Sequence, residues 1–162
     1  MKGRSRVWLL GAVALLAVVG CSDDDDPIVV VPERNFVVTM TGAKERPNPV
    51  NPSGNGTATF TLDDAETTIS YSISVASMTS TITASHIHLG NANTANGGII
   101  IALATPTNGG TVTGTITTAS TLQLGLTFPS LVALMRTSDV YVNVHTSNNT
   151  GGEIRGQIEG TP

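Results

Sequence analysis

The sequence predicts an all-β fold: an antiparallel Greek-key β-sandwich or barrel with one short helix. Composition is the first observation, since charged residues make up 12% of the chain and 17 residues are Gly, which is typical of strands and turns. The second is a series of short runs after Asn35 that alternate between apolar and polar residues, with Gly, Pro, Asn or Asp between them. Third, a single segment has the spacing of an amphipathic helix.

The first strands show the clearest alternation. A strand is expected over residues 36–41, followed by a long loop over 44–56 that is rich in Pro and Gly. The next two strands, 57–62 and 67–75, place apolar residues on one face and Thr or Ser on the other. Each of these strands is therefore expected to cover a core with one face only.

The later elements are shorter. The run 99–103 is apolar throughout, which predicts a strand that is buried on both faces. Segment 129–136 begins with a proline and carries Leu131, Leu134 and Met135 on one face, so it is the expected helix. The remaining strands are expected over residues 82–89, 111–118, 122–128, 140–146 and 153–159.

The N-terminus has the pattern of a targeting segment. Lys2, Arg4 and Arg6 precede an apolar run over residues 7–20, which ends directly before Cys21. This arrangement resembles a bacterial lipobox, in which the cysteine thiol is diacylated after residues 1–20 are removed as a signal peptide. The alternative is an ordinary secretory signal beside a stray cysteine. Because Cys21 is the only cysteine, no disulfide framework is expected.

Residues 21–34 are expected to form a flexible tether between the lipidated cysteine and a folded domain over 35–160. Four consecutive carboxylates, Asp23–Asp26, repel one another and favour a solvated chain. The run serves either as a spacer or, after Ser22, as an export signal like that of surface-exposed lipoproteins. We expect a lipid anchor in the cell envelope, at the outer membrane, on its periplasmic face or at the surface. Cys21 would be the contact with the membrane.

The charge of the chain bounds its partners. Twelve acidic residues outnumber eight basic ones, and three of the basic residues lie within the first six positions. No basic patch remains for a phosphate backbone, so nucleic-acid binding is excluded.

The histidines are the candidate chemistry. His86 and His88 are two positions apart in an expected strand, so both imidazoles point to one face. His145 lies in another strand, on the face that it shares with Tyr141 and Asn143. If these two strands are neighbours, the three imidazoles converge as a ligand set for copper or zinc.

Several motifs together resemble the CHRD domain, which is named after chordin and also occurs in bacterial secreted proteins. The resemblance covers about residues 35–160 and departs from the usual pattern at Arg46 and at Asn149-Thr150. It implies a β-rich extracellular module and specifies no activity. The motifs that carry it are the segments 40–47, 53–60, 85–90, 99–103, 141–146 and 152–158.

Three interpretations of the histidines remain open. As a metal site, they would bind copper or zinc, with Glu153 or water as a further ligand. As structural groups, they would hydrogen-bond loop backbone and fix neighbouring strands. As a catalytic site, they would suggest a metal-dependent redox enzyme, because a His-x-His strand in a β-sandwich also occurs in superoxide dismutases. The likeness to superoxide dismutases is one of fold only. The expected sandwich is immunoglobulin-like or superoxide-dismutase-like.

Asn143 and Arg155 are expected to bind a ligand or to support the structure around the histidines. Glu153 and Arg155 are two positions apart, which suggests a same-face ion pair, or else a pair between Arg155 and Asp139. The leading expectation is a lipid-anchored binding module of the cell envelope that is not an enzyme. The alternatives are the redox enzyme and a purely structural or adhesive envelope protein.

Overall fold

The computed structural model describes residues 32–50 and 53–160. The expected signal peptide, Cys21 and the acidic run Asp23–Asp26 lie outside the described residues. Within the described ranges, no helix has the length and hydrophobicity that crossing a membrane would require.

Eight strands and one short α-helix make up the described chain, as the alternating pattern predicts. A short 3-10 helix, η1 (Gly42–Lys44), follows the first strand. The strands are β1 (Asn35–Thr41), β2 (Asn55–Leu62), β3 (Thr68–Ala76), β4 (Ile82–Leu89), β5 (Ile99–Leu103), β6 (Thr111–Thr117), β7 (Val140–Thr146) and β8 (Ile154–Ile158), and α1 (Phe128–Arg136) precedes β7.

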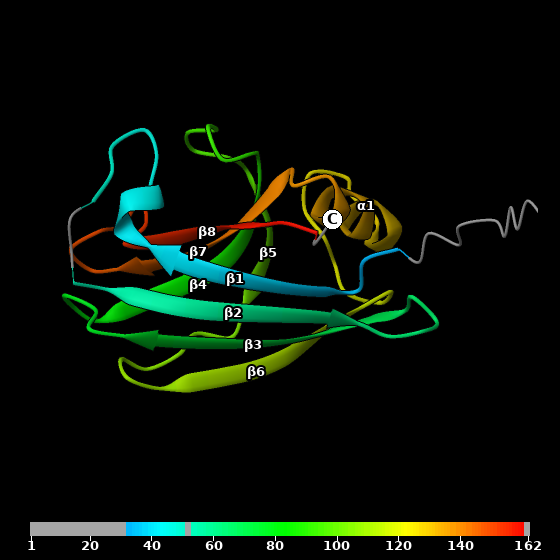
Figure 1. The fold of residues 1–162 in the computed structure, drawn as a ribbon, viewed down its shortest axis with the longest axis horizontal. Helices are drawn as coiled ribbons and strands as arrows, with labels where there is room; N and C mark the ends of the chain where they lie inside the picture. The colour runs from blue at the N-terminus through cyan, green and yellow to red at the C-terminus, as the bar shows by residue number, and fades with distance from the viewer. Residues whose placement is uncertain (1–31, 51–52, 161–162) are drawn as a thin grey trace, which may run out of the picture. The chain divides into compact units, whose positions relative to one another are not determined.

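All strand pairs are antiparallel, and the strands follow the order β5-β4-β7-β8-β1-β2-β3-β6. The sheet folds over on itself into two halves, β1-β2-β3-β6 and β5-β4-β7-β8 (Figure 1). The halves join where β1 meets β8 at the pair Thr41–Arg155. On the other side, the Ala104 amide donates to the Tyr71 hydroxyl at 2.9 Å, which links the end of β5 to β3. The fold is thus a nearly closed antiparallel sandwich or barrel.

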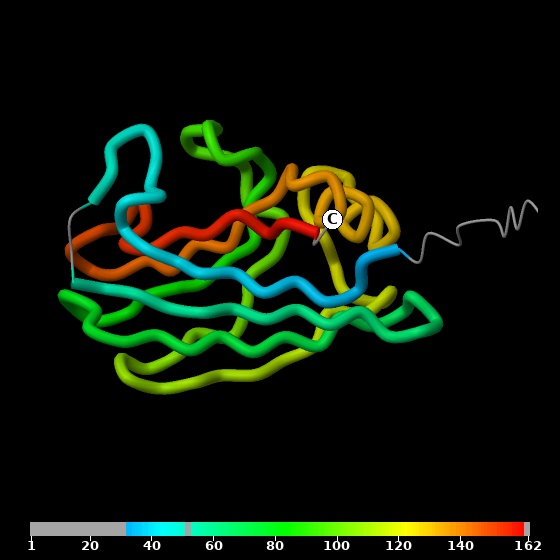
Figure 2. Tube along the Cα trace, viewed as in Figure 1, coloured from blue at the N-terminus to red at the C-terminus, as the bar shows by residue number. Residues whose placement is uncertain are grey.

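The chain crosses between the two halves three times, after β3, after β5 and after β6, so this is not a simple meander (Figure 2). The second crossing returns the chain to β6, and the third, which contains the helix α1, leads into β7. As a result, β4 and β7 are neighbours in the sheet although 50 residues separate their ends.

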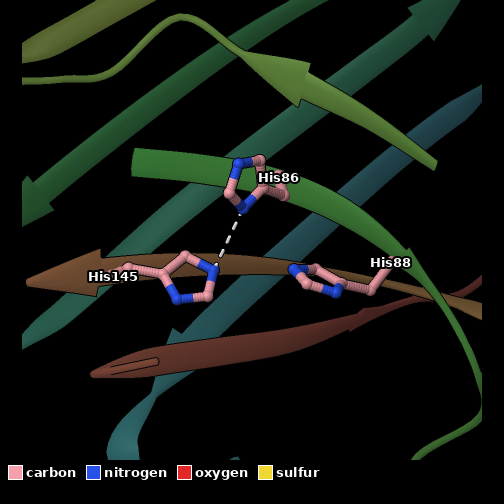
Figure 3. Close-up of side chains that lie close together, drawn as sticks. All are labelled: His86, His88 and His145. Atoms are coloured by element: carbon pink, nitrogen blue, oxygen red, sulfur yellow. Dashed lines mark hydrogen bonds between the residues drawn. The ribbon is translucent and has the colours of Figure 1, made fainter. Parts of the chain in front are cut away.

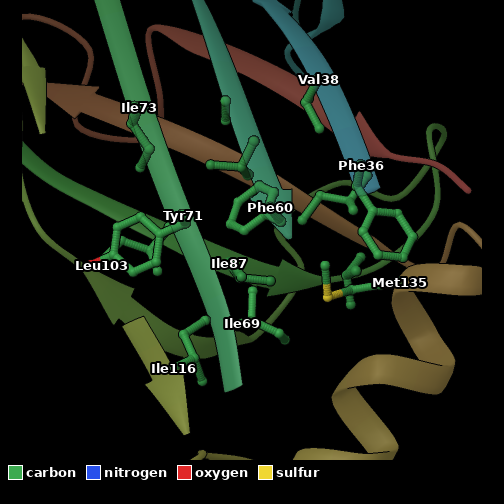
Figure 4. Packing of buried hydrophobic residues seen from close by; sticks show 14 of the residues in the cluster. Phe36, Val38, Phe60, Ile69, Tyr71, Ile73, Ile87, Leu103, Ile116 and Met135 are labelled. Carbon is green, nitrogen blue, oxygen red and sulfur yellow. The ribbon is translucent and has the colours of Figure 1, made fainter. Parts of the chain in front are cut away.

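The core lies between the two halves and contains the apolar faces that the alternation predicts. Phe60, Ile69 and Ile73 are fully buried, and the Phe60 and Tyr71 rings are 6.2 Å apart between centroids. Ile87 of β4 points toward them from the other half (Figure 4). Burial of this apolar surface is the main stabilising contribution to the fold.

The prediction of a strand over residues 122–128 is wrong. The Gln123 amide donates to the Ile100 carbonyl at 2.8 Å, but the chain then turns away. Leu124 and Gly125 have φ values of +61° and +68°, which are incompatible with the extended backbone of a β-strand. Thr127 then accepts a hydrogen bond from the Ser130 amide and begins α1, so the expected helix is confirmed one residue earlier.

Burial of β5 on both faces is also wrong. Ile100 and Leu103 are buried, whereas Ile99 and Ile101 are half-buried and Ala102 is exposed. The reason is that Ala102 pairs with His86, whose side chain points away from the core, so this side of β5 does not pack against the core.

Candidate metal centre

The register between β4 and β7 brings the three histidines together. His88 lies opposite Tyr141, and His86 lies opposite Asn143, which is two positions from His145. His145 is therefore the diagonal neighbour of His86 on the same face. This is the face that points away from the core, since the intervening residues of both strands belong to the hydrophobic cluster.

The imidazoles converge on one another. One nitrogen from each ring lies within 4.8 Å of the other two, and His86 Nδ1 is 3.1 Å from His145 Nε2 (Figure 3). Two ligands of a tetrahedral ion at a metal–nitrogen distance of 2.0–2.1 Å would be about 3.3–3.4 Å apart. The spacing of His86 and His145 is therefore already close to that of two ligands on one ion.

Backbone carbonyls fix the orientation of two rings. His88 Nδ1 is 2.8 Å from the Gly97 oxygen, and His145 Nδ1 is 3.0 Å from the Thr150 oxygen. A carbonyl only accepts hydrogen bonds, so both Nδ1 atoms carry the proton and both Nε2 atoms keep a lone pair. His88 Nε2 is buried and has no hydrogen-bond partner among the described residues.

Burial favours the neutral form of all three imidazoles. Burial lowers the pKa of each ring, and for His88 it lowers the pKa to about 4. Each of the other two histidines contributes a smaller repulsion to the lowering of the His88 pKa. A neutral imidazole is the form that binds a metal ion.

His88, Tyr141 and Arg155 form a stack of three side chains. The Tyr141 ring is parallel to the His88 ring within 7°, with 5.0 Å between centroids. On the side of β8, the Arg155 guanidinium carbon is 3.4 Å from the Tyr141 centroid. The Tyr141 hydroxyl accepts a hydrogen bond from the Gly97 amide, the same residue whose carbonyl binds His88.

Arg155 joins this stack to the loop over residues 90–98. Its two terminal nitrogens donate to the carbonyl oxygens of Thr94 and Asn91 at 2.7 and 2.8 Å. Gly97 lets the same loop approach β4, because a Cβ there would collide with the Leu89 carbonyl. The loop that fixes His88 is therefore itself held by Arg155.

Glu45 and Asn143 form a second buried pair in this region. The Asn143 amide donates to Glu45 Oε2 at 3.4 Å, and both side chains are at most 3% exposed. Burial raises the pKa of Glu45 to about 7, against a smaller lowering by Arg155. A Cβ at Gly152, whose φ is +131°, would collide with both side chains.

These side chains form one group, which we call the outer polar layer, and all of them are buried except His86, which is half-buried. The layer lies on the face of β4, β7 and β8 away from the core, beneath the segments 42–50, 90–98 and 147–152. Its members are Glu45, His86, His88, Tyr141, Asn143, His145 and Arg155.

Glu153 does not join the histidines. Its carboxylate accepts hydrogen bonds from the Thr79 amide and hydroxyl at 2.8 and 2.7 Å and from the Thr146 hydroxyl at 2.7 Å. The expected placement on the same strand face as Arg155 is wrong, because Glu153 precedes β8 and follows the left-handed Gly152. Neither an ion pair with Glu153 nor one with Asp139 is found for Arg155 among the described residues.

The sequence predicts that Tyr141 and Asn143 share the face of His145 and that Arg155 lies near the histidines, but it assigns no role to Tyr141 and gives no sign of Glu45 in this layer. The alternation along β7 places Tyr141 correctly, whereas its stacking between His88 and Arg155 depends on the tertiary structure. Glu45 lies in the motif 40–47 and had no local signal of burial.

The comparisons with known proteins identify the family. The model of the CHRD domain family matches residues 36–158, which span all eight strands except the first residue of β1. Comparison with curated proteins gave no match, and comparison with solved structures gave none. Because the match covers more than half of its length, the chain belongs to the CHRD domain family.

Proposed function

We propose that the protein is a lipid-anchored binding module of the cell envelope that holds one copper or zinc ion with His86, His88 and His145. The single observation that supports the metal most directly is the free lone pair of His88 Nε2. This atom is buried without a partner, while Nδ1 of the same ring is bound to a carbonyl. A buried polar atom without a partner is costly, and a metal ion would remove that cost.

The surroundings of the three rings also favour a metal over a purely structural role. Metal-binding histidines commonly donate their second nitrogen to a carbonyl or carboxylate, which fixes the tautomer. His88 and His145 both do so. A structural role explains these two bonds as well, but it does not explain why the buried His88 Nε2 has no hydrogen-bond partner among the described residues.

Imidazole suits both copper and zinc, so the ligand set does not choose between them. With three protein ligands, a fourth position would remain for water or for a ligand of a partner. We place the role in binding rather than in turnover, and the same variants test both.

The direct experiment removes metal with a chelator and then titrates copper or zinc into the protein without residues 1–26, which retains the whole core. We expect one ion per chain and a higher melting temperature, since a ligand at 100 times its Kd adds about 2.7 kcal/mol to stability. His88→Gln and His145→Gln should each weaken binding at least about 100-fold, because removal of supporting groups alone costs 10- to 100-fold.

Thr83→Ala, an exposed change on the same strand β4, is the matched control and should leave binding unchanged. Unchanged metal uptake in both histidine variants would refute the metal site and favour the structural role. Turnover of superoxide or peroxide that disappears in the same variants would instead support the redox enzyme.

The envelope location is proposed from the sequence features of the N-terminus. Expressed in a bacterium that lipidates such cysteines, the Cys21→Ala protein should be released from the membrane fraction, because the thioether to the lipid needs the thiol. Ser22→Ala is the control and should remain in that fraction. Retention of the Cys21→Ala protein would refute the lipid anchor.

A further inference from the structure

A cavity of about 290 Å³ lies over the outer face of β1 and β8, and none of the three histidines lines it. Three cationic side chains line it: Lys44, Arg46 and Arg155. Glu159 is the one acidic residue in the lining. An excess of positive charge in a cavity of a protein whose net charge is −4 points to an anionic ligand.

Among the described residues, the Lys and Arg side chains without an ion pair all line this cavity. The described chain contains five Lys and Arg residues, and two of them lie elsewhere. Those two are both paired, Arg34 with Asp64 and Arg136 with Glu66. For the three cations at the cavity, the described residues supply no ion pair within 4 Å.

Main-chain carbonyls hold the three cations in place without neutralising them. Lys44 Nζ donates to the Thr39 carbonyl at 2.6 Å, and Arg46 donates to the Glu45 carbonyl at 2.8 Å. Arg155 donates to two carbonyls of the loop 90–98 and is 2% exposed. Lys44 and Arg46 keep further N–H groups that these bonds do not use, while Arg155 adds a fixed charge behind them.

The rest of the lining is suited to a carbon skeleton. Val37, at the cavity on β1, is 72% exposed, which is unusual for a large apolar side chain in this domain. Val38 and Ala92 also contribute to the wall. An apolar wall beside cations favours an organic anion over an inorganic one, since phosphate has no apolar surface to bury.

We propose that this cavity binds a small organic carboxylate, with Arg46 and Lys44 contacting the carboxylate and Val37 contacting its carbon chain. Arginine and carboxylate form charge-assisted, two-point hydrogen bonds, which makes Arg46 the main specificity contact. This proposal does not depend on the metal centre.

The test titrates the full chain with butyrate, with its neutral isostere butyramide and with inorganic phosphate, followed by NMR or calorimetry. Butyrate should bind saturably and at least about tenfold more tightly than butyramide, because only the carboxylate forms charge-assisted hydrogen bonds. It should also bind at least about tenfold more tightly than phosphate, because only butyrate has a carbon chain to bury against Val37. Butyramide or phosphate binding as tightly as butyrate would overturn the proposal, as would no saturable binding of butyrate.

Three single-charge variants locate the site. Arg46→Gln should weaken butyrate binding about tenfold or more, and Glu159→Gln should strengthen it two- to fivefold by removing a like charge at the rim. Arg34→Gln changes the net charge as Arg46→Gln does, at a position away from the cavity, and should have no effect. An equal loss in Arg34→Gln and Arg46→Gln would overturn the proposal in favour of unspecific charge attraction.

Discussion

The two faces of β7 are both buried but differ sharply in what they contact. All seven residues of the strand are buried, but one face meets the apolar core and the other meets the outer polar layer. The core side is built from Val140, Val142 and Val144, and the outer side carries Tyr141 and His145 among its residues. The two faces of this strand are therefore equally buried, but one packs against apolar side chains and the other against polar ones.

The contrast extends to how each region satisfies its atoms. The core depends on apolar contact, which has no direction and leaves no polar atom to pair. In the outer polar layer, directed hydrogen bonds to loop carbonyls fix His88, His145 and Arg155. Three buried atoms of the layer nevertheless have no partner among the described residues: His88 Nε2, Glu45 Oε1 and Asn143 Oδ1. Such atoms cost stability and are expected where a ligand or a proton binds. The core stabilises the fold, whereas the outer layer contains polar atoms whose burial costs stability.

The largest effect is expected in the core. Phe60→Ala removes a fully buried ring that packs near Tyr71, so it should lower the free energy of unfolding by about 3–5 kcal/mol. Denaturant unfolding measures this loss, and Val37→Ala at an exposed position should change stability by less than about 0.5 kcal/mol. A loss below about 1 kcal/mol in Phe60→Ala would contradict the assignment of this core.

In the outer layer, removing a charge should stabilise the protein. Between pH 4.5 and about 7 the folded state binds more protons at Glu45 than the unfolded state does, because burial raises the pKa of this carboxyl. Its contribution to the free energy of unfolding therefore falls as the pH rises through this window. Glu45→Gln should be more stable than the native protein by up to about 3 kcal/mol above pH 7.

The difference should shrink as the pH falls toward 4.5 and disappear below it, where Glu45 is protonated in both states. The buried imidazoles act in the opposite sense, since their lowered pKa values make stability rise with pH, but they do so equally in both proteins. Urea unfolding at several pH values measures the difference. A difference that does not change with pH would contradict a neutral Glu45 in the fold.

Arg155 tests whether the outer layer depends on geometry rather than on charge alone. Arg155→Lys keeps the charge but loses the planar group that stacks on Tyr141 and bridges the carbonyls of Thr94 and Asn91. We expect a loss of about 2 kcal/mol. Amide exchange should become faster in the loop 90–98 but not in β2 and β3, and equal acceleration in both regions would contradict the separation of the two layers.

The smallest and most selective effect compares two tyrosines. The Tyr71 hydroxyl accepts from the Ala104 amide at 2.9 Å, and the Tyr141 hydroxyl accepts from the Gly97 amide at 3.0 Å. Each change to Phe should cost about 1 kcal/mol. Only Tyr141→Phe should also weaken copper or zinc binding, about tenfold, because Gly97 orients His88. Equal metal affinity in both variants would show that the loop does not support the metal site.

Local patterns were enough to predict most strands of this fold. The alternation over 57–62 and 67–75 has the period of the β backbone, so it marks both the strand and its core face without knowledge of the neighbours. The pattern failed over 122–128, where Leu124 and Gly125 form a left-handed turn. It failed again for β5, because an apolar run does not show which of its side chains will lie on a face that is open to solvent.

The site divides in the same way. The sequence by itself determined that His86 and His88 share a face and that His145 lies on the face of its strand opposite the valines, since successive side chains of a strand alternate. Only the tertiary structure decided that β4 and β7 are neighbours in a register that sets His145 diagonal to His86. It also decided that two loop carbonyls orient the rings and that Glu153 turns toward Thr79 and Thr146. The physical reason is that side-chain direction follows from the adjacent backbone, whereas a meeting of distant residues depends on strand order, register and the paths of loops.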